Sequence, residues 1–158
     1  YGSISGIYCP DKKATAVNGI LGRGKNVISE LIVPHEVVEQ RLHSPAAQVV
    51  QLNIRKNLVG TLLAGGIRSA NAHYANMLLA FYLATGQDPA NIVEGSQGIT
   101  HAEDRAGDLY FSCTLPNLIV GTVGNGKHAS FVDENLEAPR LPRRPAARRE
   151  RQPASRHR

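Results

Sequence analysis

Asp11, Lys12 and Lys13 are the neighbouring residues of this chain whose types could together do chemistry. They follow the rigid Pro10 and precede an apolar run. Two adjacent lysines cannot lie on one face of a strand, because side chains alternate along it, so the pattern predicts a loop that presents both. A carboxylate beside them can orient one ammonium group and keep it charged. Asp, Pro and Lys are also ordinary turn residues, so a solvated turn is the alternative explanation.

Lys56 is a second candidate, because a helical pattern from Ala46 to about Leu63 places it on an apolar stripe together with Asn53. A lysine in such a position either extends its ammonium group to solvent or serves a site. The remaining stripe residues are Val49, Leu52, Val59 and Leu63, and those of the polar face are Gln48, Gln51 and Arg55.

A further apolar helix is predicted from Asn71 to Thr85, on which His73 and Asn76 lie three residues apart and share a face. Gly86 is a natural helix stop, so Asp88 falls just beyond the C-terminus of this helix. A carboxylate there meets the negative end of the helix dipole, and its ionised form needs a cation nearby. The alternatives are a hydrogen-bonded core histidine at 73 and a capping or turn role at 88.

Two glycine-containing turns could approach anionic groups. A turn of this kind allows backbone N–H groups to approach phosphate or amide groups. The turn from Gly22 to Lys25 lacks the full spacing of a phosphate loop and a following helix, so it is predicted to be a hairpin turn. The other turn follows a predicted strand and consists of Gly121, Thr122, Val123, Gly124, Asn125 and Gly126.

These residues must be positioned by a mixture of strands and helices. After Pro34, a helix is expected from His35 to His43, and Ser44 is expected to cap the long helix that follows. Its inward residues would be Val37, Val38 and Leu42. A last helix is expected to begin at Phe131 and to break off at Pro139. The strand-like segments are Asn26–Val33, Gly98–His101, Asp108–Thr114, with Leu109, Phe111 and Cys113 on one side, and Leu118–Val123.

Composition describes a soluble globular protein. The chain has 158 residues, of which 42% are hydrophobic and 20% charged, which suffices for one domain with a core. Cys9 and Cys113 are too few and too far apart to indicate a disulfide framework or a zinc site, so a reducing, cytoplasmic setting is expected. We expect no membrane segment and no signal peptide, because no apolar run is long enough and no basic-then-apolar start is present. A chain that starts with Tyr1 fits a fragment or a processed product.

Charge is divided unevenly between the body and the end of the chain. From Arg140 to Arg158 there are eight arginines and one acid, which gives this tail +7. The remaining ten Lys and Arg face twelve Asp and Glu, so residues 1–139 carry −2. The tail is too poor in large apolar residues to fold, which predicts disorder, and it could tether a nucleic acid. A reading-frame error just after Glu137 is a further explanation.

Six stretches together carry a resemblance to one enzyme family. The chain resembles the catalytic domain of 3-hydroxy-3-methylglutaryl-CoA reductase, and it is most similar to the class that uses NADPH. The resemblance runs from about Ser3 to Glu137, with the stretches in the family's order and at very nearly its spacings. They are Tyr8–Lys13 (YCPDKK), Gly22–Lys25 (GRGK), Asn53–Gly60 (NIRKNLVG), Asn71–Asn76 (NAHYAN), Gly86–Asp88 (GQD) and Gly121–Gly126 (GTVGNG).

The resemblance implies reduction of 3-hydroxy-3-methylglutaryl-CoA to mevalonate and CoA, with two hydrides from NADPH. Lys12 would stabilise the charge that develops on the substrate oxygen, and Asp88 would contact Lys12 and a glutamate. Lys56 would be a buried partner of the substrate carboxylate. By the same mapping, the acyl group would be held by Ser5, Asp11, Lys13, Lys56 and Asn76, and His73 would lie near CoA. The cofactor would lie against the turn Gly121, Thr122, Val123, Gly124, Asn125 and Gly126, and no metal is implied.

The resemblance also predicts an architecture. Residues 1–138 would be an α+β part of the large substrate-binding domain, with a long central helix packed on a few antiparallel strands, and residues 139–158 a separate Arg/Pro-rich tail. The parent enzyme would be a homo-oligomer with active sites between subunits. The family's catalytic glutamate and histidine would lie outside this chain, so the chain alone is expected to be inactive. Ile7 stands where the family commonly has Asn. A CoA-binding module without redox chemistry and a nucleic-acid-binding protein that acts through its tail are the alternatives.

Overall fold

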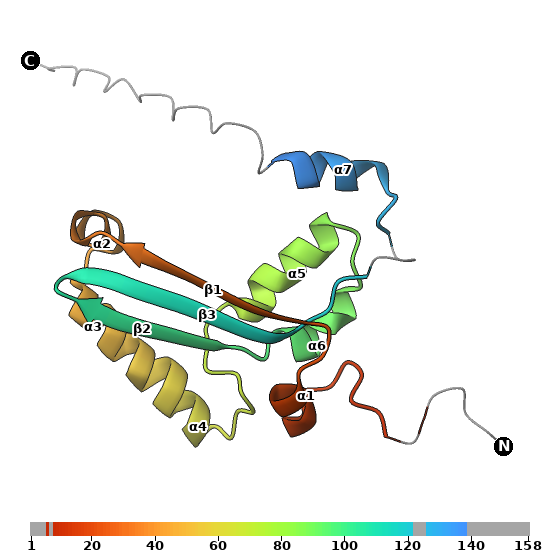
Figure 1. The fold of residues 1–158 in the computed structure, drawn as a ribbon, viewed down its shortest axis with the longest axis horizontal. Coiled ribbons are helices and arrows are strands. Elements are labelled where there is room, and N and C mark those ends of the chain that lie inside the picture. The colour runs from red at the N-terminus through yellow and green to blue at the C-terminus, as the bar shows by residue number, and fades with distance from the viewer. Residues whose placement is uncertain (1–5, 7, 122–125, 139–158) are drawn as a thin grey trace, which may run out of the picture.

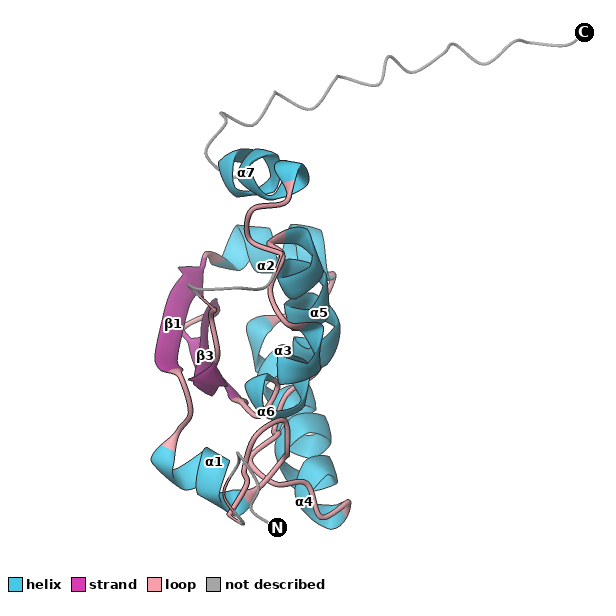
Figure 2. Ribbon diagram, turned by 90° about the vertical axis from the view of Figure 1, so that its right-hand side faces the viewer, coloured by secondary structure: helices cyan, strands magenta, loops and turns pink. Residues whose placement is uncertain are grey.

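The structure is a computed structural model that describes residue 6, residues 8–121 and residues 126–138. It is a two-layer arrangement in which a three-stranded sheet is covered on one side by helices (Figure 1, Figure 2). The α+β class, the long helix and the antiparallel sheet expected from the sequence are therefore confirmed. Among the described residues, none of the helices has both the length and the apolar character needed to cross a bilayer. The predicted tail, residues 139–158, lies outside the described residues.

The sheet consists of β1 (Lys25–Val33), β2 (Ile99–Arg105) and β3 (Asp108–Leu118), in the order β1-β3-β2 with every pair antiparallel. β3 is the central strand, so Cys113 lies opposite both Ser29 and Thr100. β2 and β3 form a hairpin whose two turn residues, Ala106 and Gly107, have φ values of 57° and 99°. Two consecutive positive φ values are typical of the tight turns that match the twist of an antiparallel pair.

The helices follow the sequence in an order that brings most of them onto one face of the sheet (Figure 2). A continuous helical run contains α3 (Ala46–Leu52), a π-helical segment η1 (Asn53–Gly60) and α4 (Thr61–Leu63). The others are α1 (Ala16–Leu21), α2 (His35–Leu42), α5 (Tyr74–Ala84), the single 3₁₀ turn η2 (Pro89–Asn91), α6 (Ile92–Gly95) and α7 (Ser130–Glu137).

The core lies between the sheet and the first helices of this layer. Its fully buried members come from α2, α3, β2 and β3, and further apolar side chains pack against them. Leu109 and Phe111 of β3 point to this side, as the alternation along the strand predicts. The buried members are Val38, Ala46, Ala102 and Leu109, with Val33, Val49, Val50 and Phe111 around them.

Several predicted boundaries and connections are wrong. Residues 16–21 form the helix α1, so the link from Gly22 to Lys25 joins a helix to a strand and is not a hairpin turn. Thr15 starts α1 because its Oγ1 accepts a hydrogen bond from the N–H of Asn18, 3.2 Å away. Ser44 does not cap the long helix, whose N-cap position is occupied by Pro45. The strand predicted from residue 118 is the end of β3, and residues 119–121 are not in a strand.

The predicted inward faces of two helices are only partly correct. In α2, Val38 is buried, but Val37 and Leu42 are exposed. On the long helix, Val49 lies against the core, whereas Leu52, Val59 and Leu63 are exposed. The π-helical segment explains the last two, since its i→i+5 spacing shifts the inward positions away from an ordinary helical period. The inward residues there are Asn53, which is buried, and the half-buried Asn57 and Leu58.

Candidate active site

Lys12 and Asp88 form an ion pair between the loop before α1 and the segment after α5. Nζ of Lys12 lies 2.7 Å from Oδ2 of Asp88. The hydrogen bond from Lys12 holds the pKa of Asp88 below its ordinary value, and the same bond raises the pKa of Lys12. At neutral pH the pair is therefore an ammonium group beside a carboxylate. Lys12 is therefore the cation that was predicted to lie near Asp88.

The two oxygens of Asp88 have different partners. Oδ2 faces Lys12, while Oδ1 accepts a hydrogen bond of 3.0 Å from the N–H of Ala90. That second bond caps the single turn η2, so the capping role and the cation-binding role both apply. Because the cap fixes the orientation of the carboxylate, Oδ2 is aimed at Lys12 by the local backbone.

The loop that carries Lys12 rests on buried amide side chains. Nδ2 of Asn18 donates to the carbonyl oxygens of Pro10 and Lys13, at 2.8 and 2.7 Å. Nε2 of Gln97 donates to the carbonyl oxygen of Thr15 at 3.1 Å. Asn18 and Gln97 are almost completely buried. Sequence reasoning missed both, although a polar asparagine inside the apolar run of residues 14–21 was an available signal.

A second support of this loop contains charges. Glu94 in α6 is fully buried, and its Oε1 accepts hydrogen bonds from the backbone N–H of Lys12 at 3.3 Å and from Nδ2 of Asn91 at 2.9 Å. Nε of Arg23 lies 3.5 Å from the same oxygen, and Nη2 of Arg23 lies 2.6 Å from Oδ1 of Asp11. Neither Arg23 nor Glu94 was predicted, because the contacts join segments far apart in the sequence.

Lys13 turns back onto its own loop. Its Nζ donates to the carbonyl oxygen of Asp11 at 3.0 Å and approaches Sγ of Cys9 at 3.5 Å. The side chain is exposed, so its ammonium group is accessible from solvent. The structure therefore confirms a loop that presents two lysines, only one of which is paired with Asp88.

His73 and Asn76 are brought together at the start of α5. Nδ1 of His73 lies 3.3 Å from Nδ2 of Asn76, so the two side chains meet as predicted, although α5 begins at Tyr74 and not at Asn71, and His73 therefore precedes the helix. His73 occupies the N-cap position with φ at 66°, a left-handed conformation that is uncommon for a residue with a side chain. Both are exposed, so a core role for His73 is wrong.

Lys56 does not have the buried environment that was expected of it. It lies in the π-helical segment and is exposed to solvent. The inward position of that segment is taken by Asn53, whose Nδ2 donates to the carbonyl oxygen of Thr100 at 3.2 Å. The wider π-helical turn places Asn53, and not Lys56, against the sheet.

The ends of the predicted cofactor turn are fixed to the segment that precedes Asp88. The N–H of Gly121 donates to Oε1 of Gln87 at 2.6 Å, and the N–H of Gly126 donates to the carbonyl oxygen of Gly86 at 2.8 Å. Gly86 has φ at 64°, and a Cβ there would lie 2.4 Å from the carbonyl carbon of Gly126, so only glycine fits. Thr122, Val123, Gly124 and Asn125 lie outside the described residues, as does Ser5.

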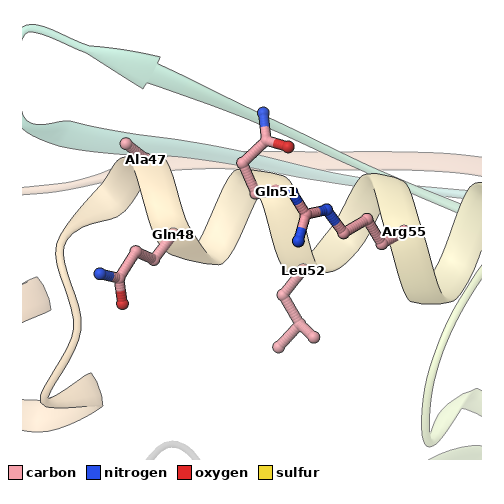
Figure 3. A pocket seen from close by; sticks show the side chains of 5 residues that line it. All are labelled: Ala47, Gln48, Gln51, Leu52 and Arg55. Carbon is pink, nitrogen blue, oxygen red and sulfur yellow. The ribbon is translucent and has the colours of Figure 1, made fainter.

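Two hollows lie away from the ion pair. One of 430 Å³ runs along the outer side of α3 and η1, where Gln48 and Leu52 point away from the strands behind the helix (Figure 3). Its other lining residues are Ala47, Gln51 and Arg55. The second, of 380 Å³, is an apolar groove lined by Tyr74, Met77, Leu78 and Phe81 of α5 and by Cys113, Leu115 and Leu118 of β3. Neither contains a predicted site residue. No group of His, Cys, Asp and Glu within the described ranges is arranged to hold a metal ion.

The fold and the paired charges define an α+β domain with a lysine loop supported from beneath. Residues 1–141 match the family model described as Hydroxymethylglutaryl-coenzyme A reductase. The chain belongs to the hydroxymethylglutaryl-coenzyme A reductase family. The family predicted from the six stretches is therefore confirmed.

Individual relatives agree with the family match. The chain is 50% identical over 135 residues to the 3-hydroxy-3-methylglutaryl-coenzyme A reductase of Methanothermobacter thermautotrophicus, which covers 85% of this chain and 34% of that protein. The enzyme of the same name from Pyrococcus abyssi is 53% identical over 137 residues, 86% of this chain and 33% of that protein. That of Phycomyces blakesleeanus is 52% identical over 126 residues, 78% of this chain and 11% of that protein. The chain thus spans between 11% and 34% of the length of these relatives.

Proposed function

We propose that this chain supplies the substrate-binding lysine loop of an enzyme that reduces 3-hydroxy-3-methylglutaryl-CoA to mevalonate and CoA with two NADPH. The observation that carries the proposal is the 2.7 Å ion pair between Lys12 and Asp88, in a chain that belongs to the reductase family. The proposal assigns residues 1–138 to the catalytic domain and leaves residues 139–158 as a separate tail.

Lys12 is proposed to stabilise the oxygen of the substrate carbonyl as negative charge develops on it. An ammonium group is a compact positive charge and suits this task. Lys12 is charged at neutral pH, which lies far below its ordinary pKa of 10.5, and the hydrogen bond to Asp88 raises that pKa further. Asp88 would keep the ammonium group in place through Oδ2 while the cap on η2 restrains its own carboxylate.

The acyl and CoA parts of the substrate are proposed to lie against the exposed polar residues around this pair. Lys13 and Lys56 both present ammonium groups to solvent, which is what recognition of the substrate carboxylate requires. Asp11 already pairs with Arg23, so it would act from a fixed position. The proposed set is Ser5, Asp11, Lys13, Lys56 and Asn76, with His73 on the CoA side.

The turn from Gly121 to Gly126 is the proposed contact for NADPH. The position of the turn supports this proposal, because both of its ends are hydrogen-bonded to Gly86 and Gln87, directly before Asp88. The backbone of Gly126 packs against Gly86 at a distance that leaves no room for a side chain. NADPH, when bound, would supply the hydride. The role of this chain would be to hold NADPH next to Lys12.

We also propose that the assembled enzyme is a cytoplasmic homo-oligomer with active sites between subunits. The two cysteines, Cys9 and Cys113, are unpaired, which suits a reducing compartment. Exposed apolar side chains on β1, among them Ile28 and Ile32, offer a surface that a second copy could cover.

Isothermal titration calorimetry with 3-hydroxy-3-methylglutaryl-CoA tests the contribution of this chain. We expect the chain to bind the thioester, and Lys12→Met to weaken binding at least about tenfold, because a charged hydrogen bond is lost. Lys25→Met, at an exposed lysine that begins β1, is the matched control and should bind as the unchanged chain does. Equal affinity in both variants would contradict the role of Lys12.

NADPH oxidation measured at the same time separates binding from turnover. The chain spans at most 34% of its curated relatives named above, so we propose that it binds the thioester without turning it over. Steady NADPH consumption that depends on the thioester would refute this part. Thioester binding with no NADPH binding in a separate titration would favour a CoA-binding module.

A further inference from the structure

We propose that Glu94 and Arg23 are positioning residues that together hold the Asp11–Lys12 dipeptide and thereby set the Lys12 ammonium group against Asp88. The proposal rests on the proposed function in treating Lys12 as the group that meets the substrate. It assigns Glu94 and Arg23 no contact with substrate or cofactor.

Lys12 needs such a support because of its backbone conformation. Its φ of 53° lies in the left-handed region, which is unfavourable for a residue with a side chain. A residue keeps this conformation only where its surroundings impose it. The N–H of Lys12 is held directly, by the 3.3 Å hydrogen bond to Oε1 of the buried Glu94.

Arg23 closes a ring of contacts around the same dipeptide. Its Nη2 lies 2.6 Å from Oδ1 of Asp11, and its Nε lies 3.5 Å from Oε1 of Glu94. The side chain of Asp11 is thus attached to Arg23 and the backbone of Lys12 to Glu94, and these two charged groups are in contact with each other. Rotation of Lys12 out of its left-handed conformation would break one contact or the other.

The same short segment holds Lys12 at both of its ends. Asp88 contacts Nζ through Oδ2, and Glu94 contacts the backbone N–H through Oε1. Residues 88–94 comprise the cap of η2, η2 itself and the start of α6, and Asn91 ties this segment to Glu94 through a 2.9 Å hydrogen bond. The distance between the two contacts is therefore fixed by one piece of backbone.

A fully buried carboxylate at position 94 is poorly explained by stability alone. Glu94 is fully buried, and its Oε2 has no hydrogen-bond partner among the described residues, nor has Nε of Arg23. Removing a carboxylate from water costs free energy that an imperfect pair does not recover, so an apolar side chain of similar size would serve folding better. A function in orienting Lys12 accounts for a carboxylate at this position.

The pKa of Lys12, measured by NMR titration of its side chain in the 158-residue chain, tests the proposal without substrate. Arg23→Gln is the deciding variant, because the two explanations predict opposite signs. Loss of a nearby positive charge alone would raise the pKa of Lys12. In the native chain Asp88 raises the pKa of Lys12. Loss of positioning would separate Lys12 from Asp88, so the pKa of Lys12 would instead fall toward 10.5. We expect the fall.

Three further variants keep the test decisive. Arg23→Lys, which keeps a cation that can reach Asp11, should recover part of the native value, and Arg55→Gln, on the outer side of the long helix, should leave it unchanged. Where Arg23→Gln does not fold, Glu94→Gln replaces it, and the readout is the amide proton of Lys12, whose chemical shift should move upfield when a neutral acceptor replaces the carboxylate. An unchanged or raised pKa of Lys12 in folded Arg23→Gln, or an unmoved amide in Glu94→Gln, would overturn the proposal.

Thioester affinity distinguishes failure of this inference from failure of the proposed function. Under both proposals, Arg23→Gln lowers the pKa of Lys12 and weakens thioester binding several-fold. A lowered pKa with no thioester binding in the native chain would support the positioning role and refute the function. Native thioester binding with an unshifted pKa in Arg23→Gln would do the reverse.

Discussion

At the scale of residues, the site is a single lysine held by carboxylates on two sides. Asp88 pairs with the ammonium group, and Glu94 accepts a hydrogen bond from the backbone N–H of the same residue. The pair is half-exposed, with 42% of the Lys12 side chain and 30% of the Asp88 side chain accessible. Water and salt screen such pairs, so the value of the pair lies in orientation more than in stability.

Asp88→Asn should therefore lower the melting temperature slightly, and only within a defined pH window. Asp88 has a lowered pKa in the folded chain, so its contribution is present above its ordinary pKa of 3.8 and is lost as pH falls through the folded value. Lys12 has a raised pKa, so its contribution is present below 10.5 and is lost as pH rises through the folded value. Thermal unfolding at several pH values should show the largest difference near neutrality. A difference that persists at pH 2 would contradict this account, since Asn retains the cap to Ala90.

Asn18→Ala should destabilise the chain more strongly. The substitution leaves the carbonyl oxygens of Pro10 and Lys13 without their buried donor, and each loss of this kind costs about 1–3 kcal/mol. Urea unfolding gives the free energy directly. Asn26→Ala, at an exposed asparagine in β1, is the control and should change it by less than about 0.5 kcal/mol. Equal effects of the two substitutions would show that the buried amide does not support the loop.

At the scale of elements, the strands and the long helical runs could be predicted from the sequence, whereas the π-helical segment and the long-range contacts could not. β1 and the start of β3 were located correctly, because β-branched and aromatic residues cluster there between turn signals. The π-helical segment was missed, since its spacing mimics an ordinary helix with misplaced polar residues. The contact between Lys12 and Asp88 was predicted through short motifs. Arg23 and Glu94 were not predicted, because neither a glycine-flanked arginine nor a glutamate in a four-residue helix signals in the sequence that it contacts the lysine loop.

Gly24→Ala tests how the start of β1 is joined to the end of β3. Gly24 has φ at 79°, and a Cβ there would lie 2.6 Å from the carbonyl oxygen of Leu118. The conformational penalty alone is about 1–2 kcal/mol, and displacement of the two strands adds to it. Gly65→Ala is the matched control, because Gly65 has φ at 72° and open space around its Cβ position. The difference between the two unfolding free energies isolates the contact, and we expect Gly24→Ala to be the worse.

At the scale of the whole molecule, one face of the sheet is covered by helices and the other face is open. The helices gather on one side of the sheet, and β1 forms one of its edges (Figure 2). Ile28 and Ile32 lie on the opposite side of β1 from the core residue Val33, and they are 68% and 55% exposed. An exposed edge strand with apolar side chains is a template for association.

The chain should therefore self-associate in a concentration-dependent manner through β1. Sedimentation velocity across a range of concentrations should show species larger than the monomer, and Ile28→Lys with Ile32→Lys should shift the distribution toward the monomer. Leu63→Lys is the control, since Leu63 is 84% exposed on the long helix, away from β1. A monomer at every concentration, or an equal shift in the control, would refute association through this strand.

The close contact of Gly86 with Gly126 gives residue 86 two tasks: it holds the end of the turn at Gly126, and it places the segment that carries Asp88. A single added methyl group at residue 86 would meet the backbone of Gly126 and would also disturb the short segment that leads to Asp88, the partner of Lys12. In a library of all substitutions at position 86, we therefore expect no variant that displaces Gly126 and keeps the Lys12–Asp88 contact, or the reverse. Second-site suppressors of its variants would have to move two stretches of backbone at once, and such suppressors should be rare.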